Sequence, residues 1–256
     1  MRRRTLIVAA AAATLLAAAA IALAEPMRRN ETLQFISPAR FRETAFERFV
    51  GAMGEEIYLL GTVAPQTTKS DQSLGRLRGV ITRLRPDVVL VEMPPEEMAR
   101  DNLADGPVEA LYATLVSRDA GIPALGFDWR MADAEGGAEG EAREDRMFGN
   151  AHAAFAGHRK VLILVSLAHR QAFAERLRTL GFRRAPLAGA DKARLLEAAG
   201  APATYPIGMA AYLHRRIDAD RAAREAAADP TRAAALDHAI STRVALLRRI
   251  WAVGEA

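Results

Sequence analysis

The sequence predicts an α/β protein with a mostly parallel central sheet covered by helices. Short apolar runs rich in Val, Leu and Ile alternate along the chain with longer stretches whose apolar residues recur at helical spacing. The central runs are apolar at consecutive positions, which is typical of parallel strands buried on both faces. We expect one domain over residues 25–256, with an N-terminal hairpin and a helical C-terminal extension over residues 208–256.

Each predicted strand is a short apolar run that ends at a turn signal. Gly51 to Gly54 form a plausible turn between two such runs, which predicts the hairpin. Later runs end at Pro94-Pro95, at Asp128 and at a histidine. The predicted strands are Leu33–Ile36, Phe46–Val50, Glu56–Leu60, Asp87–Glu92, Ile122–Phe127 and Val161–Ser166.

The predicted helices follow from apolar positions three and four residues apart. The first ends at Arg85-Pro86, because proline cannot continue a helix. The acidic, glycine-rich segment from Ala132 to Gly140 is predicted to be a loop or lid. The C-terminal region interleaves arginine and alanine, which favours an amphipathic helical pair on the sheet; a surface for a partner or a membrane is the alternative. The predicted helices are Leu74–Leu84, Val108–Arg118, Glu141–Ala156, Arg170–Leu180, Ala190–Ala199 and a pair within Met209–Val253 that breaks near Asp229-Pro230.

The N-terminus resembles a bacterial secretory signal over residues 1–24. Three arginines precede the apolar run from Leu6 to Ala24, and Ala22-Leu23-Ala24 fits a small-x-small cleavage site. We therefore expect a periplasmic or secreted protein. The alternative is a retained inner-membrane anchor, because the run is almost long enough to span a bilayer.

Charge and composition exclude several function classes. The chain has 35 basic and 31 acidic residues, and removal of the three signal arginines leaves 32 against 31. This near balance, without a basic stripe with interleaved aromatics, argues against nucleic acid as a partner. The chain has no cysteine, which excludes disulfides, thiolate metal sites and a cysteine nucleophile.

Polar side chains follow four of the predicted strands. Carboxyl ends of parallel strands share one edge of a sheet, so these residues are expected to converge there. A histidine at such an edge can bind a metal or move a proton at neutral pH. The alternatives are structural, because Glu92 and Asp128 could cap a helix or a turn and His169 could be merely hydrogen-bonded. The candidates are Gly61, Thr62, Glu92, Asp128, Arg130, Ser166 and His169.

Four short segments of the chain resemble, in their order and spacing, the motifs of the TraB/GumN/Tiki family. That family is related to the ChaN-like and erythromycin-esterase-like superfamily. Tyr58 to Ala64 is similar to its first Gly-Thr-x-His segment, and Arg85 to Glu92 to its Arg-Pro-Asp strand that ends in glutamate. Arg143 to Met147 is similar to its Arg-Asn/Asp-x-x-Met helix start, and Val161 to His169 to its second Gly-x-x-His segment.

The resemblance implies an exported metal-dependent hydrolase, and Tiki members are proteases. In the family the ion is held by the two motif histidines with help from the glutamate. The resemblance therefore implies Glu92 and His169 as metal ligands or catalytic base, with Gly61 and Thr62 in the first turn and Arg143 as a substrate or structural partner. The chain departs from the family at Ala64, which stands where the first histidine belongs, and at Ser166, which stands where glycine belongs.

Ala64 leaves two hypotheses open, because alanine can neither bind a metal nor move a proton. Gln66 could offer only a weak carbonyl ligand in its place. The first hypothesis is a peptidase-like hydrolase with a degenerate first metal motif. The second is a non-catalytic descendant, a pseudoenzyme that binds a peptide, a protein or a small molecule. A different α/β family, with His169 as an axial haem or iron ligand, is a third reading.

Overall fold

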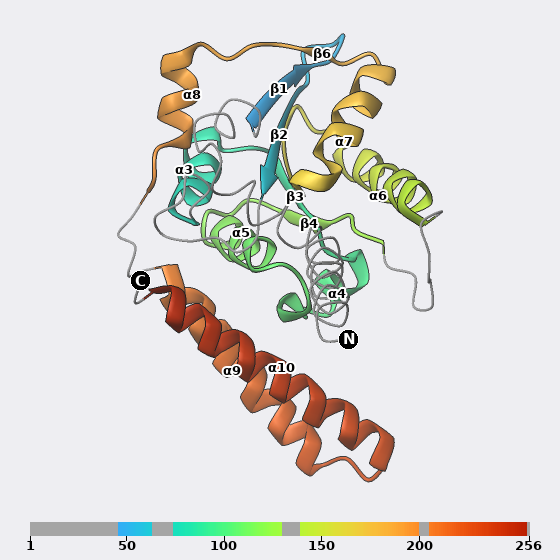
Figure 1. Ribbon diagram of the computed structural model, residues 1–256, viewed down its shortest axis with the longest axis vertical. Helices are drawn as coiled ribbons and strands as arrows, with labels where there is room; N and C mark the ends of the chain where they lie inside the picture. The colour runs from blue at the N-terminus through green and yellow to red at the C-terminus, as the bar shows by residue number, and fades with distance from the viewer. Residues whose placement is uncertain (1–45, 63–73, 130–138, 200–204, 255–256) are drawn as a thin grey trace, which may run out of the picture. The chain divides into compact units, whose positions relative to one another are not determined.

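The computed structural model describes residues 46–62, 74–129, 139–199 and 205–254 (Figure 1). Its described strands form a six-stranded mixed sheet in the order β4-β3-β5-β2-β1-β6. The predicted α/β fold is confirmed. The strands are β1 (Phe46–Val50), β2 (Glu56–Thr62), β3 (Val88–Val91), β4 (Ala124–Gly126), β5 (Lys160–Ser166) and β6 (Arg183–Arg184).

The four strands β4, β3, β5 and β2 run parallel to one another. β1 is antiparallel to β2, which confirms the N-terminal hairpin, and it also pairs with the short strand β6, which the sequence analysis missed. The strands β2 and β5 are neighbours in register, so that Gly61 lies opposite Val165 and Thr62 opposite Ser166. The two segments that resemble the family's paired motifs therefore end side by side.

Helices cover both faces of this sheet, in agreement with the continuous apolar strands (Figure 1). Val89 and Val91 of β3 pack into one core with α3 and α5, while Val88 and Leu90 face a second core with α6 and α7. The described helices are α3 (Leu74–Leu84), α4 (Pro95–Ala99), the 3-10 helix η1 (Leu103–Asp105), α5 (Val108–Asp119), α6 (Glu139–Phe155), α7 (Leu167–Thr179), α8 (Gly189–Leu196), α9 (Tyr205–Glu225) and α10 (Pro230–Gly254).

Three boundaries differ from the expectations for physical reasons. β4 is shorter than predicted and lies at the sheet edge, where Leu125 is 41% exposed. α7 begins at Leu167, so His169 lies in its first turn and not in a preceding loop. Pro94-Pro95 does follow the end of the strand as expected, but α4, which begins at Pro95, was not predicted, although proline is well suited to the first turn of a helix.

Several expectations fall outside the described residues. These are the signal segment 1–24, the short strand at Leu33–Ile36, the residues Ala64, Gln66 and Arg130, and residues 132–138 of the expected lid. Glu139 and Gly140, which were placed in that lid, belong to α6.

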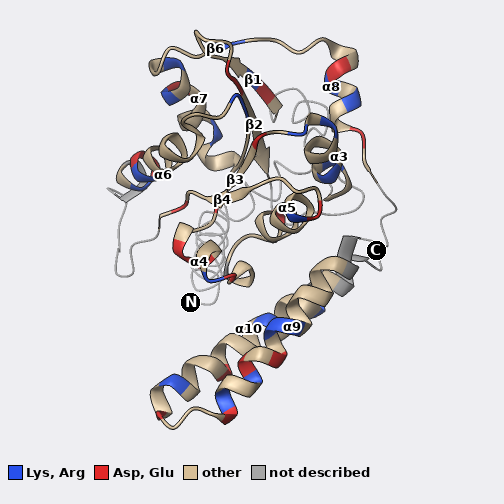
Figure 2. Ribbon diagram, turned by 180° about the vertical axis from the view of Figure 1, so that it is seen from behind, with Lys and Arg blue, Asp and Glu red and all other residues tan. Residues whose placement is uncertain are grey.

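The C-terminal extension is a pair of helices that breaks where Asp229-Pro230 predicted (Figure 1). Basic and acidic residues are interleaved along it (Figure 2). The expected placement of this pair on the sheet is wrong. The pair meets the rest of the described chain at α5 and the turn after α4, where the Tyr212 hydroxyl donates to the Asp101 carbonyl and accepts from the Leu103 N–H. Arg243 pairs with Asp220 at 2.6 Å and donates to Asn102. None of the described helices combines the length and the apolar character that crossing a bilayer demands.

The phenol of Tyr58 in β2 makes folding sensitive to alkaline pH. Burial, followed by the nearby Glu56 carboxylate, raises its pKa to about 12 from 10.0. The unfolded chain loses this proton first, so the free energy of unfolding should fall as pH rises from 10.0 towards 12. In denaturant titrations at pH 9 and pH 11, Tyr58→Phe should lose less stability between the two pH values than the wild type. An equal loss in both proteins would contradict this assignment.

Candidate functional site

The candidate site lies at the carboxyl ends of β3 and β5, which are neighbours in the sheet. Glu92 follows the last residue of β3 directly, and Ser166 ends β5. The backbone N–H of Ser166 donates a 2.6 Å hydrogen bond to Oε2 of Glu92. The neighbouring parallel strands therefore bring these strand ends to one edge of the sheet, as expected.

The structure brings Glu92 and His169 together, although 76 positions separate them in the sequence. Nε2 of His169 lies 3.9 Å from Oε1 of Glu92, and the two side chains are only 17% and 13% exposed. Burial raises the pKa of Glu92 above its ordinary value of 4.5, and the Asp128 carboxylate acts in the same direction. The Ser166 N–H, His169 and Arg143 oppose the shift. Glu92 thus combines a raised pKa with an imidazole neighbour, a pattern that marks candidate functional sites.

His169 is oriented by a carboxylate that the sequence analysis did not select. Nδ1 of His169 lies 3.0 Å from Oε1 of Glu144, on α6. Because a carboxylate accepts, Nδ1 donates to Glu144, and Nε2 is the ring nitrogen that faces Glu92. The other oxygen of Glu144 lies 3.6 Å from Arg176, which also binds Asp145 at 2.6 Å. The position of Glu144 directly after Arg143 in a family-like motif was the available signal.

Arg143 lies between the carboxylates of Asp128 and Glu92. Its Nη2 lies 2.8 Å from Oδ1 of Asp128 and 3.7 Å from Oε1 of Glu92. Its Nε donates to the Trp129 carbonyl at 3.2 Å. Asp128 is 2% exposed and also accepts the Trp129 N–H at 2.8 Å. Arg143 therefore provides the positive charge that a buried carboxylate requires.

Thr62 and Gly61 shape the neighbouring part of the edge. The Thr62 hydroxyl lies 3.2 Å from Glu109, a buried carboxylate in the first turn of α5 that the sequence analysis missed, and 3.4 Å from the Val165 carbonyl. A Cβ on Gly61 would meet Leu167 at 2.5 Å, so glycine lets the first turn of α7 lie against β2. Ser166 contributes its backbone N–H to Glu92 and makes no side-chain cap on α7.

The described donors fit a divalent metal only in part. Nε2 of His169 and Oε1 of Glu92 face one another, but the described part of the chain contains no group of three His, Cys, Asp or Glu side chains arranged to hold a metal. Catalytic zinc normally has three protein ligands. The guanidinium of Arg143 beside the same Glu92 oxygen also opposes a second cation. This donor set fits a weakly held ion.

Comparison with protein-family models, with curated proteins and with solved structures finds no match. The resemblance to the TraB/GumN family therefore stays a prediction from the short motifs.

Glu144→Gln should weaken any chemistry at His169 about 10- to 100-fold, the usual cost of losing a residue that orients a functional histidine. The amide keeps the shape of the carboxylate but lacks its charge, so it holds the Nδ1 proton less firmly. The measurement is kcat/KM on the substrate found in the screen described below. Asp145→Asn is the matched control, because Asp145 also binds Arg176 but makes no contact with His169. Equal losses in the two variants would show that Glu144 has no special role.

Proposed function

We propose that this chain is an exported, peptidase-like hydrolase of the TraB/GumN type, with Glu92 and His169 as its central residues. The observation that carries the proposal is the 3.9 Å approach of the two side chains, with the far nitrogen of His169 tied to Glu144. A buried carboxylate with a raised pKa beside an oriented imidazole is suited to accept a proton from water near neutral pH.

The geometry supports a simple division of roles. Two atoms 3.9 Å apart can both contact one water molecule through hydrogen bonds of about 2.8 Å. Glu92 then accepts the proton of this water and returns it to the amine nitrogen as the C–N bond breaks, while Nε2 of His169 orients the water. Arg143, which reaches Glu92 and is 35% exposed, would stabilise negative charge on the carbonyl oxygen under attack.

A divalent ion would be held by His169 Nε2 and Glu92 Oε1. When bound, it would polarise the carbonyl and lower the pKa of the attacking water. With two protein donors and a guanidinium nearby, we propose that this ion exchanges readily and is not permanently bound. The roles of Glu92, His169 and Arg143 described above are those of the side chains themselves.

A screen of quenched fluorescent peptides tests the proposed function. The purified chain is assayed with zinc, with manganese and with a chelator, beside His169→Ala. His152→Ala is the matched control, because His152 is an exposed histidine of α6 that lies against Phe148 and Phe155. We expect cleavage by the wild type and the control and its loss in His169→Ala. Activity that survives in His169→Ala would overturn the assignment.

A non-catalytic binding protein is the second candidate, and one observation favours it. Arg143 pairs with Asp128 and approaches Glu92, and Glu144 contacts His169, so each of these side chains already has a partner within the chain. Such a closed network also occurs in purely structural sites. Absence of cleavage under every condition of the screen would favour this candidate.

Ala64→His should tighten divalent-metal binding at least about 10-fold, because it restores a third protein ligand. Residue 64 follows Thr62 by two positions, and Thr62 is paired in register with Ser166. The measurement is zinc affinity by competition with a chromophoric chelator. The gain should vanish in the double variant with His169→Ala. An unchanged affinity would show that the first segment does not contribute to this site.

A further inference from the structure

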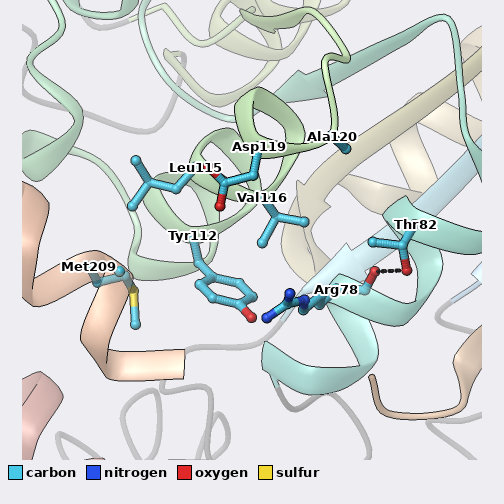
Figure 3. A pocket seen from close by; sticks show the side chains of 9 residues that line it. Arg78, Thr82, Tyr112, Leu115, Val116, Asp119, Ala120 and Met209 are labelled. Atoms are coloured by element: carbon cyan, nitrogen blue, oxygen red, sulfur yellow. Dashed lines mark hydrogen bonds between the residues drawn. The ribbon is translucent and has the colours of Figure 1, made fainter. Parts of the chain in front are cut away.

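A cavity lies away from the site described above. It has a volume of about 230 Å³ and lies between α3, α5 and the start of α9 (Figure 3). Its lining includes Asp119, at the far end of α5 from Glu109. The 12 residues of α5 separate the two ends by about 16 Å, at 1.5 Å per residue. The cavity is therefore distinct from the Glu92–His169 centre.

One side of this cavity presents a positive charge without a protein partner. Arg78 of α3 is half-buried. Its guanidinium forms no hydrogen bond or ion pair with any residue that the structure describes. A guanidinium has five N–H donors in a fork that matches a carboxylate. Figure 3 shows the Arg78 guanidinium directed towards the space beside the Tyr112 ring. This end of the cavity is suited to a ligand carboxylate.

The opposite side presents negative charge. Asp119 is the last residue of α5, where the carbonyl end of the helix is partially negative. Its carboxylate points into the cavity in Figure 3 and makes no ion pair with Arg78 or with another described residue. This end of the cavity is suited to a ligand ammonium group.

The wall between the two charges is apolar. It is formed by Leu115, Val116 and Met209, together with the buried ring of Tyr112. The volume lies below the ~300–1,000 Å³ of pockets for drug-sized ligands, so the occupant must be small. A carboxylate, an ammonium group and a short apolar side chain together describe an aliphatic amino acid.

We propose that this cavity binds a free aliphatic amino acid, with its carboxylate on Arg78, its ammonium on Asp119 and its side chain on the apolar wall. The proposal does not depend on the hydrolase assignment, because the cavity shares no residue with that site.

Isothermal titration of the full chain with L-leucine, L-valine and L-methionine tests the proposal. At least one should bind with a Kd below about 1 mM. Two analogues of the amino acid that binds test the charged groups: its amide, which lacks the carboxylate, and its des-amino acid, which lacks the ammonium group. Each should bind at least about 10-fold more weakly than the amino acid itself.

Variants of the two charged residues assign the ligand groups. Arg78→Gln should weaken amino-acid binding at least about 10-fold but leave binding of the amide unchanged. Asp119→Asn should likewise weaken amino-acid binding at least about 10-fold but leave binding of the des-amino acid unchanged. Arg232→Gln, at an exposed arginine of α10 outside the cavity lining, is the control and should bind as the wild type does. Absence of binding by all three amino acids, or binding that Arg78→Gln leaves unchanged, would overturn the proposal.

Discussion

Glu92→Gln should lower kcat/KM for peptide hydrolysis at least about 100-fold, because a general base contributes typically 10²–10⁴-fold. Glutamine fills the same space and its amide oxygen can still accept the Ser166 N–H that now binds Oε2 at 2.6 Å. The amide cannot take a proton from a water molecule held between residue 92 and His169, whose Nε2 lies 3.9 Å from Oε1 of Glu92 in the wild type. Steady-state kinetics on the peptide found in the screen measures this loss.

Stability distinguishes lost chemistry from lost structure in this variant. Burial raises the pKa of Glu92, so the folded chain holds its proton more tightly than the unfolded chain. The free energy of unfolding of the wild type should therefore fall as pH rises above 4.5, through the window that ends at the raised pKa. Glu92→Gln lacks this fall, and its stability relative to the wild type should improve between pH 4 and pH 7. A variant that becomes relatively less stable over this interval would contradict the account of Glu92.

Arg143→Met should destabilise the fold by about 2–3 kcal/mol at pH 7, which is less than the roughly 3–5 kcal/mol that follows removal of one partner from a fully buried ion pair. The variant removes the guanidinium that lies 2.8 Å from Asp128, a carboxylate that is 2% exposed and also accepts the Trp129 N–H. Arg143 itself is 35% exposed, which reduces the expected cost. Urea denaturation followed by circular dichroism measures the change.

A double variant shows whether this cost arises from the lost ion pair with Asp128. Asp128→Asn removes the carboxylate charge, so Arg143→Met should cost at least about 1 kcal/mol less in that background. Arg146→Met is the matched control, because Arg146 is exposed on the same helix and lies over the Trp129 ring. Equal costs of Arg143→Met with and without Asp128→Asn would contradict the proposed pairing.

The fold was predictable where the apolar pattern was complete. β5 and α3 follow the expected ranges closely, because consecutive apolar residues or helical spacing leave few alternatives. β4 was predicted too long, because Ile122 and Phe127 are buried like strand residues although they lie outside the ladder. The start of α7 was placed too late, because Ser166 to His169 contains no proline or glycine to mark it.

The site was predictable to the extent that strand ends converge. Glu92 and His169 could be paired from the sequence because both follow parallel strands. Glu144 and Glu109 could not, because they lie on helices whose orientation against the sheet depends on tertiary packing. The motif around Arg143 indicated the right segment of α6 but not which of its carboxylates faces His169.

The most direct measurement of the central claim is a kinetic double-mutant cycle of Glu92→Gln and His169→Ala on the cleaved peptide. If both residues act on one water molecule, each single variant should lose most of the activity and the double variant should lose little more. Losses that multiply in the double variant would mean that the two side chains work independently, and the proposed common centre would be wrong.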